Sequence, residues 1–358
     1  MASTWPTEIL LLRDLVAIPS VSGDEEGVAR LVEETVRGWG LPVARDETGV
    51  RLRIAGRKAG PTLAFVSHLD VVPPGAGWTR DPFTPVIEGT MLHGRGAGDA
   101  KASVAAMLVS AMDVAQEGGP ARGDLLLLLG FGEETRNTSM PDLVARAGPV
   151  NAAVVGEPTN LDFAVAQRGL MMVDLVAHGD QRHAGRVSED GPFTNALVLL
   201  SRDLVKLEGL FRDRPHLLLG HPTVTPTMVE AGVSRNVTPP RARAILDVRS
   251  TPAWTHAELA DALSQALDCE VLVTSDRLVP CETRLDSPLL AAASRVRPQA
   301  RHYGSPTCSD WVFLREADGF KCGPGTSSRS HTPDECVDLR EVTAARRFYA
   351  DLARAYLQ

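Results

Sequence analysis

The sequence has few of the features that mark secreted, membrane-spanning or nucleic-acid-binding proteins. Its 358 residues include five cysteines, an odd number, and none of them forms a CxxC pair. This pattern fits reduced thiols in a cytoplasm better than a disulfide framework or a thiolate zinc site. No apolar run approaches the roughly 20 residues of a membrane helix. The first residues also lack the basic start and small-residue cleavage site of a secretory signal.

The chain also lacks an excess of positive charge. Its formal net charge is -8, whereas a surface that binds nucleic acid is usually basic. Hydrophobic residues make up 44% and charged residues 23%, which is typical of a soluble globular protein. A single hydrophobic core rarely grows past about 250–300 residues. We therefore expect a cytoplasmic protein of two domains that binds neither nucleic acid nor membrane.

Apolar runs alternate with helical patterns in the first part of the chain. Residues 62–66 and the leucines at 125–129 predict strands that are buried on both faces, and residues 103–116 predict an Ala-rich helix. Such alternation favours an α/β fold with a mostly parallel central sheet flanked by helices. In these sheets ligands bind beyond the carboxyl ends of the strands.

The pattern changes after Arg168. Six segments between residues 170 and 274 follow the order strand, helix, strand, strand, helix, strand. This is the order of a ferredoxin-like α+β sandwich. We expect residues 169–278 to form an inserted domain, and residues 1–168 and 279–358 to form one discontinuous domain around it.

Polar side chains gather where the predicted strands of the first domain end. In VSHLDVVP, His68 and Asp70 are two residues apart along a strand, so both side chains lie on one face. A carboxylate beside an imidazole fixes the tautomer of the ring and makes its other nitrogen a better metal ligand. Further carboxylates and a second histidine follow along the chain at Asp99, Glu133, Glu134, Glu157 and His331.

Two imidazoles with several carboxylates and no cysteine suit divalent ions such as Zn²⁺, Co²⁺ or Mn²⁺. Two such ions need a bridging ligand and terminal ligands, and one further carboxylate must stay free to deprotonate a water. Glu133 and Glu134 are adjacent, point in different directions and can divide these duties. Taken singly, each residue is more often a turn or cap residue, so the prediction depends on the set.

The glycine-rich string GRGAGD, residues 94–99, has an alternative interpretation as a phosphate-binding loop. No GK[ST] follows it, and the carboxylate of Asp99 would repel a phosphate. The sequence therefore favours the metal-site interpretation of this segment.

Together, the strings VSHLDVVP, HGRGAGDAKAS, GFGEET, VVGEPT and GPGTSSRSHTPDE resemble the two-zinc aminoacylase and carboxypeptidase family of metallopeptidases, the M20 type. The resemblance implies a zinc-peptidase-like catalytic domain with an inserted lid and dimerisation domain. It implies that His68 and Glu157 hold one metal, that Glu134 and His331 hold the other, and that Asp99 bridges them. Asp70 would orient His68, and Glu133 would be the general base.

The resemblance also implies functional residues in the inserted domain and next to it. His183, in GDQRHAGR, matches a histidine that stabilises the oxyanion, often from the partner subunit of a homodimer; Arg182 departs from the common Ser or Gly. Arg168, Asn236 and Arg249 match positions that contact substrate. For Arg249, a salt bridge at a strand end is an equally good interpretation.

Within the family, GSPTCSDW and GPGTSSRSHT look most like the N-acyl-ornithine deacetylase branch. We expect hydrolysis of N-acetyl-L-ornithine to ornithine and acetate, a step of arginine biosynthesis, with two divalent metals, most simply Zn²⁺. Rival substrates are acetylcitrulline, succinyl-ornithine, succinyl-diaminopimelate, carrier-linked lysine and peptides. A non-catalytic binding module of the same fold is the alternative from another class, but it predicts a missing ligand or base, and none is missing.

Overall fold

The computed structural model describes residues 5–186 and 191–358, and its contacts divide the chain into two compact units. The first unit holds the described residues up to Val165 together with Glu282–Tyr303 and Ser309–Gln358. The second unit holds Ala166–Cys281 and Gly304–Cys308. The insertion expected from the sequence, residues 169–278, lies inside this second range.

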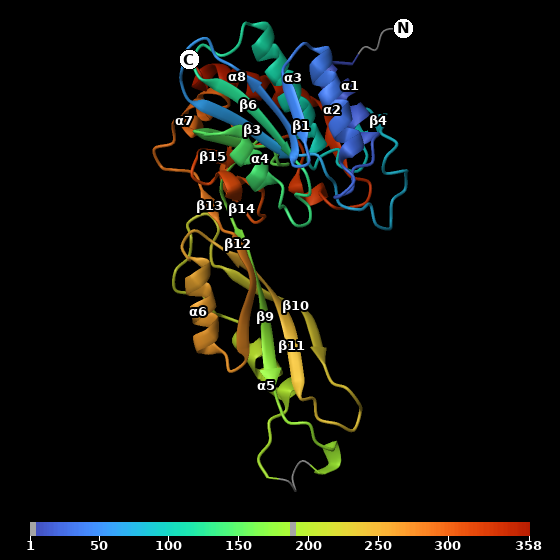
Figure 1. The fold of residues 1–358 in the computed structure, drawn as a ribbon, viewed down its shortest axis with the longest axis vertical. Helices are drawn as coiled ribbons and strands as arrows, with labels where there is room; N and C mark the ends of the chain where they lie inside the picture. The colour runs from blue at the N-terminus through green and yellow to red at the C-terminus, as the bar shows by residue number, and fades with distance from the viewer. Residues whose placement is uncertain (1–4, 187–190) are drawn as a thin grey trace. The chain divides into compact units, whose positions relative to one another are not determined.

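The first unit is built on a large mixed sheet in the order β1-β2-β6-β3-β7-β15-β8-β13, with β14 paired to β8 (Figure 1). The last residues of β8 and β14 and the first residue of β13 fall in the second range. The strands are β1 (Val43–Asp46), β2 (Gly49–Ile54), β3 (Thr62–His68), β6 (Asp124–Gly130), β7 (Ala152–Val155), β8 (Phe163–Gln167), β13 (Cys281–Glu282), β14 (His302–Ser305) and β15 (Asp318–Lys321). The four central strands β6, β3, β7 and β15 are parallel, as predicted.

The edges of this sheet differ from the prediction of a mostly parallel sheet. β1 and β2 pair antiparallel because a tight turn at Asp46–Gly49 joins them, and a turn of this length cannot connect parallel strands. β2 also pairs antiparallel with β6, and β8 pairs antiparallel with β15. The parallel centre carries the apolar runs that are visible in the sequence: every residue of β3 is buried, as is every residue of β6 after Asp124.

Helices pack around this sheet and supply the rest of the main core. They are α1 (Thr7–Val16), α2 (Glu26–Gly38), α3 (Lys101–Gln116), α4 (Met140–Ala147), α7 (Pro288–Val296) and α8 (Leu339–Tyr356). α3 is buried along most of its length because it packs against α1, α8 and β3. It begins at Lys101, two residues after Asp99, so a rigid element helps to fix the position of that carboxylate. A small sheet of order β16-β5-β4 consists of β4 (Val86–Glu88), β5 (Met91–His93) and β16 (Cys336–Asp338).

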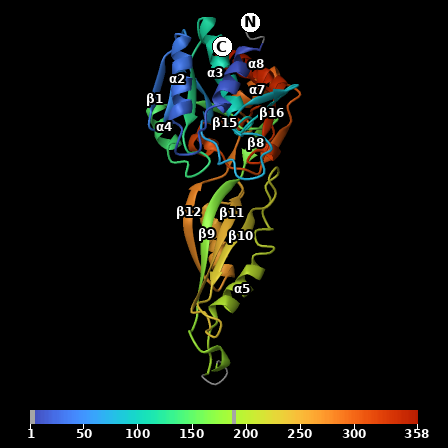
Figure 2. The same ribbon diagram turned by 90° about the vertical axis from the view of Figure 1, so that its right-hand side faces the viewer.

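The second unit is a four-stranded antiparallel sheet in the order β10-β11-β9-β12 (Figure 2). Its elements are β9 (Gly169–His178), α5 (Ala196–Lys206), β10 (Thr223–Ala231), β11 (Arg241–Ser250), α6 (His256–Ala266) and β12 (Glu270–Leu278). The predicted ferredoxin-like order is confirmed. Both helices have strong start signals: Asn195 caps α5, and Thr255 and Glu258 form a capping box on α6.

One face of this second sheet is covered by both helices. Alternate residues of β9 and β11, among them Val173 and Leu246, form a separate core with Leu200 of α5 and Leu263 of α6. Across the described ranges 5–186 and 191–358, no helix is long and apolar enough to cross a membrane.

Candidate metal centre

His68 stands at the carboxyl end of β3 with its ring fully buried. Its Nδ1 atom lies 3.0 Å from the backbone oxygen of Asp70 and 3.4 Å from the Asp70 carboxylate. Both neighbours accept hydrogen bonds, so in the neutral ring Nδ1 carries the proton and the lone pair is on Nε2. The Nε2 atom lies 3.3 Å from Oδ1 of Asp99. The ring therefore presents a metal-binding nitrogen to the Asp99 carboxylate.

The two oxygens of the Asp99 carboxylate face two different imidazoles. Oδ1 lies 3.3 Å from His68 Nε2, and Oδ2 lies 3.6 Å from His331 Nε2. Ligands that share one tetrahedral ion at about 2.0–2.2 Å are separated by roughly 3.3–3.6 Å. The observed separations are therefore compatible with the bridging role that the sequence predicts for Asp99, which stays a prediction.

Glu134 extends this group on the side of His331. His331 Nε2 lies 3.0 Å from Oε2 and 3.1 Å from Oε1 of Glu134. Ligand atoms of His68, Asp99 and Glu134 all lie within 4.8 Å of one another. Hydrogen bonding to Glu134 raises the pKa of His331, with burial opposing the shift and the charge of Asp99 adding to it. Four of the five predicted ligands are thus in one cluster.

Glu157, the fifth predicted ligand, follows β7. Its Oε1 atom is buried and has no hydrogen-bond partner. Burial and the neighbouring charge of Asp99 raise the pKa of Glu157 to about 8, against the opposing charge of His68. A buried carboxylate without a partner is costly, and a bound cation removes that cost. The donor set and this orphaned oxygen together fit a site for divalent metal.

Glu133 lies beside the cluster, close enough to interact with the charges of His68, Glu134 and Glu157. Desolvation raises the pKa of Glu133 well above its ordinary value; the charges of Glu157 and Asp310 add to this, and His68 opposes it. A carboxyl group with a raised pKa can both accept and return a proton near neutral pH. This is the property that a general base needs.

Asp70 organises more of the site than its sequence position indicated. Its carboxylate accepts hydrogen bonds from the backbone N–H groups of Glu133 and Glu134, each at 3.0 Å, and from Ser22 Oγ at 2.6 Å. Burial opposes ionisation, but the hydrogen bonds and the charge of His68 outweigh it and lower the pKa of Asp70 to about 2. Asp70 therefore stays charged and fixes both His68 and the segment that carries the two glutamates.

Two features of the site were not predicted from the sequence. Asp310 is buried, accepts a hydrogen bond of 2.9 Å from Asn137 Nδ2, and has a pKa raised to about 7 by burial. Asp310 lies in the string GSPTCSDW, which supports the family resemblance but predicts no role for this residue. A buried ion pair of 2.7 Å joins Arg95 to Glu335, in the strings GRGAGD and SHTPDE. Both acids follow turn-like residues, so nothing local in the sequence shows that they are buried.

The remaining predicted site residues belong to the second unit. His183 Nδ1 accepts a hydrogen bond of 3.1 Å from the backbone N–H of Gly185, so in the neutral ring the proton is on Nε2. His183 pairs with Val237 in an isolated bridge, and the N–H of Ala184 donates to the carbonyl of Asn236 at 2.8 Å. His183 and Asn236 therefore lie in neighbouring loops, with an N–H donor available on the imidazole.

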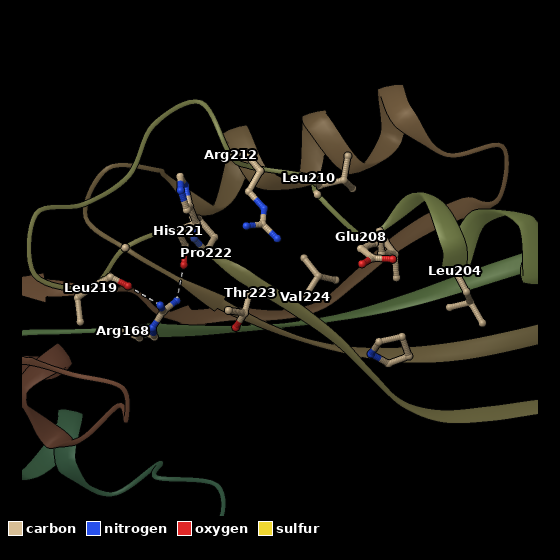
Figure 3. A pocket seen from close by; sticks show the side chains of 14 residues that line it. Arg168, Leu204, Glu208, Leu210, Arg212, Leu219, His221, Pro222, Thr223 and Val224 are labelled. Atoms are coloured by element: carbon tan, nitrogen blue, oxygen red, sulfur yellow. Dashed lines mark hydrogen bonds between the residues drawn. The ribbon is translucent and has the colours of Figure 1, made fainter.

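Arg168 and Arg249 are neighbours, but their guanidinium groups already have partners. Arg168 donates to the carbonyl oxygens of His221 at 2.8 Å and of Leu219 (Figure 3). It also donates to the carbonyl oxygen of Arg249 at 3.2 Å. These bonds fix the backbone at His221 and Leu219, which line a groove of about 650 Å³. Arg249 donates to both carboxylate oxygens of Asp247, at 2.7 and 3.0 Å. Substrate binding by either arginine stays a prediction.

The sequence of this chain is similar to those of known proteins. Residues 64–355 match the sequence profile of peptidase family M20/M25/M40. A succinyl-diaminopimelate desuccinylase from Cereibacter sphaeroides is 30% identical, over 97% of this chain and 98% of that protein. The chain therefore belongs to peptidase family M20/M25/M40 and is a metal-dependent hydrolase of that family.

Solved structures share the fold over nearly the whole chain. An M20 metallo-carboxypeptidase from Sulfolobus solfataricus superimposes with a TM-score of 0.81, at 20% identity, over 98% of this chain and 99% of that one. A dinuclear metal-binding M20 peptidase from Bacillus subtilis gives a TM-score of 0.75 at 19% identity, over 98% and 97% of the two chains. The expected fold class is confirmed.

Proposed function

We propose that this protein hydrolyses the amide bond of an N-acyl amino acid at a two-metal centre. The observation that carries the proposal is the Asp99 carboxylate, whose two oxygens face His68 and His331 at 3.3 and 3.6 Å. His68 and Glu157 would hold one ion, and Glu134 and His331 the other. Zn²⁺ suits this donor set, as do Co²⁺ and Mn²⁺. When bound, such ions polarise the amide carbonyl and lower the pKa of a water.

The chain's own residues would move the protons. Glu133 accepts a proton from the attacking water and later delivers it to the leaving amine, so the products are a carboxylic acid and a free amino group. Its adjacency to Glu134 and its raised pKa support this role. The Nε2–H of His183 would donate to the oxyanion of the tetrahedral intermediate. We propose that the partner subunit of a homodimer supplies this histidine.

A fixed cation would hold the free carboxylate of the substrate. Arg249 is the better of the two arginine candidates because, among the residues that the structure describes, only its Nε and Nη2 atoms are engaged, both by Asp247. Its Nη1 atom therefore remains available for a carboxylate. Arg168 is less suitable, since both of its Nη atoms already donate to carbonyl groups.

N-acetyl-L-ornithine is the proposed substrate, and the strings GSPTCSDW and GPGTSSRSHT support it. N-succinyl-diaminopimelate is the second candidate, because relatives of about 30% identity that span the chain are named succinyl-diaminopimelate desuccinylases. Both are N-acyl derivatives of an α-amino acid with a second amino group. The reaction is the same for both, so the acyl group and the distal end of the substrate decide between them.

Steady-state kinetics on a substrate panel test this proposal. We expect the highest kcat/KM on N-acetyl-L-ornithine, with N-acetylcitrulline, succinyl-ornithine, N-succinyl-diaminopimelate and a dipeptide as comparisons. One methylene added to or removed from a substrate changes kcat/KM by about 10–200-fold in an apolar pocket. A higher kcat/KM on the succinylated compounds would replace acetylornithine by the second candidate. Turnover of the dipeptide alone would contradict the N-acyl amino acid class.

A further inference from the structure

The glycine-rich segment GRGAGD encloses the carboxylate of Glu335. Oε1 of Glu335 accepts hydrogen bonds from the backbone N–H groups of Gly98 at 2.8 Å and Asp99 at 3.0 Å. Oε2 accepts from the N–H of Gly96 at 3.0 Å and from Nη1 of Arg95 at 2.7 Å. The side chains of Arg95 and Glu335 are each 1% exposed. This segment is therefore an anion-binding loop whose anion is the chain's own carboxylate.

Gly96 is needed for the shape of this loop. Gly96 has φ +81°, in the left-handed region that favours glycine, and a Cβ there would come within 2.6 Å of Val71. At Gly98 a Cβ would lie 3.5 Å from Oε1 of Glu335, an ordinary van der Waals contact, so the fit there is less strict. Backbone N–H groups that converge in this way form a concave nest for negative charge. The spacing of glycines thus serves the Glu335 carboxylate and explains a string that resembles a phosphate loop.

Glu335 joins the two segments that carry Asp99 and His331. Its carboxylate holds the N–H of Asp99 itself, and Glu335 follows His331 by four residues. Its backbone oxygen accepts from the N–H of Gly94 at 2.9 Å, and the next residue, Cys336, pairs with His93 between β16 and β5. The bridging carboxylate and the second imidazole therefore share one hydrogen-bonded frame.

We propose that Glu335, paired with Arg95, is a positioning residue that sets Asp99 against His331 and so preorganises the centre for metal. This inference rests on the proposed function, because it concerns the same metal centre. Without the carboxylate, three buried N–H groups lose their acceptor and the Arg95 guanidinium loses its counter-charge. The segment that carries Asp99 is then free to shift. Residues that orient metal ligands typically contribute about 10–100-fold to metal affinity.

The test compares Glu335→Gln with Glu8→Gln in the full-length protein. Glu8 is also fully buried and accepts hydrogen bonds from Arg346 and Thr343, each at 2.8 Å, but it holds neither ligand-bearing segment. Zn²⁺ affinity is measured by competition with a chromophoric chelator, and folding by circular dichroism and thermal unfolding. We expect Zn²⁺ affinity to fall about 10–100-fold in Glu335→Gln and to stay within about threefold of wild type in Glu8→Gln.

If Glu335→Gln does not fold, a second variant, Arg95→Lys, tests the same positioning role. It keeps the carboxylate and its backbone donors but replaces a guanidinium that also donates to Pro74 O at 3.3 Å. We expect a smaller loss of Zn²⁺ affinity in the same direction. Wild-type affinity in either folded variant at position 335 or 95, or an equal loss in Glu8→Gln, would overturn the positioning role. Failure of the wild-type protein to bind Zn²⁺ would instead overturn the proposed function on which this inference rests.

Discussion

Replacement of Glu133 by alanine is expected to lower kcat by about 10²–10⁴-fold, the range that a positioned general acid–base contributes. Metal content should not change, because Glu133 is proposed to transfer a proton and not to bind a metal ion. KM should also change little, since the residue acts mainly in the transition state. The measurement is steady-state kinetics on the best substrate of the panel, together with metal analysis of the same preparation.

Glu34→Ala is the matched control for this variant, because Glu34 is an exposed glutamate of α2 outside the metal centre. It should have wild-type kcat. Normal turnover by Glu133→Ala would show that another group accepts the proton. Loss of metal from Glu133→Ala would assign the residue to the ligand set and would leave the base unidentified.

Replacement of Asp99 by alanine is expected to have the larger effect on the centre as a whole. Asp99 faces both imidazoles, so in the proposed centre its removal would take a ligand from both ions at once. Each ion is worth several kcal/mol of transition-state stabilisation, so we expect activity to fall by at least about 10³-fold. Metal analysis should show that both ions are lost or weakened together.

Asp142→Ala, at an exposed aspartate of α4, controls for the loss of one carboxylate. It should keep the activity and the metal content of wild type. If Asp99→Ala retained one tightly bound ion and lost the other, Asp99 would be a terminal ligand of a single site. The bridging assignment would then be wrong.

The parts of the fold that the sequence predicts are those with strong periodic patterns. The apolar runs of β3 and β6 predict buried parallel strands, and the strand and helix order of the second unit predicts its sheet; both predictions are confirmed. The antiparallel direction of the edge strands is not predicted. β1 has four residues of intermediate burial and no clear alternation, so no signal in its own sequence sets its direction.

At the metal centre too, the sequence predicts some residues and does not predict others. His68, Asp99, Glu134 and His331 stand in strings that could be assigned before their contacts were known, and the structure brings them together. Glu335 could not be assigned, because its partners are backbone N–H groups from a segment more than two hundred residues away, and side-chain patterns carry no record of them. The partners of Arg168 are likewise carbonyl oxygens, which the sequence does not mark.

The two-metal centre is the central claim, and metal stoichiometry tests it most directly. Wild-type protein is freed of metal with a chelator, dialysed against excess Zn²⁺, freed of unbound ion and measured by elemental analysis beside Asp99→Ala. We predict about two ions per chain in wild type, with turnover lost on chelation and restored by Zn²⁺ or Co²⁺. We predict far fewer ions in Asp99→Ala. A wild-type value near zero would contradict the account and favour a binding module of the same fold.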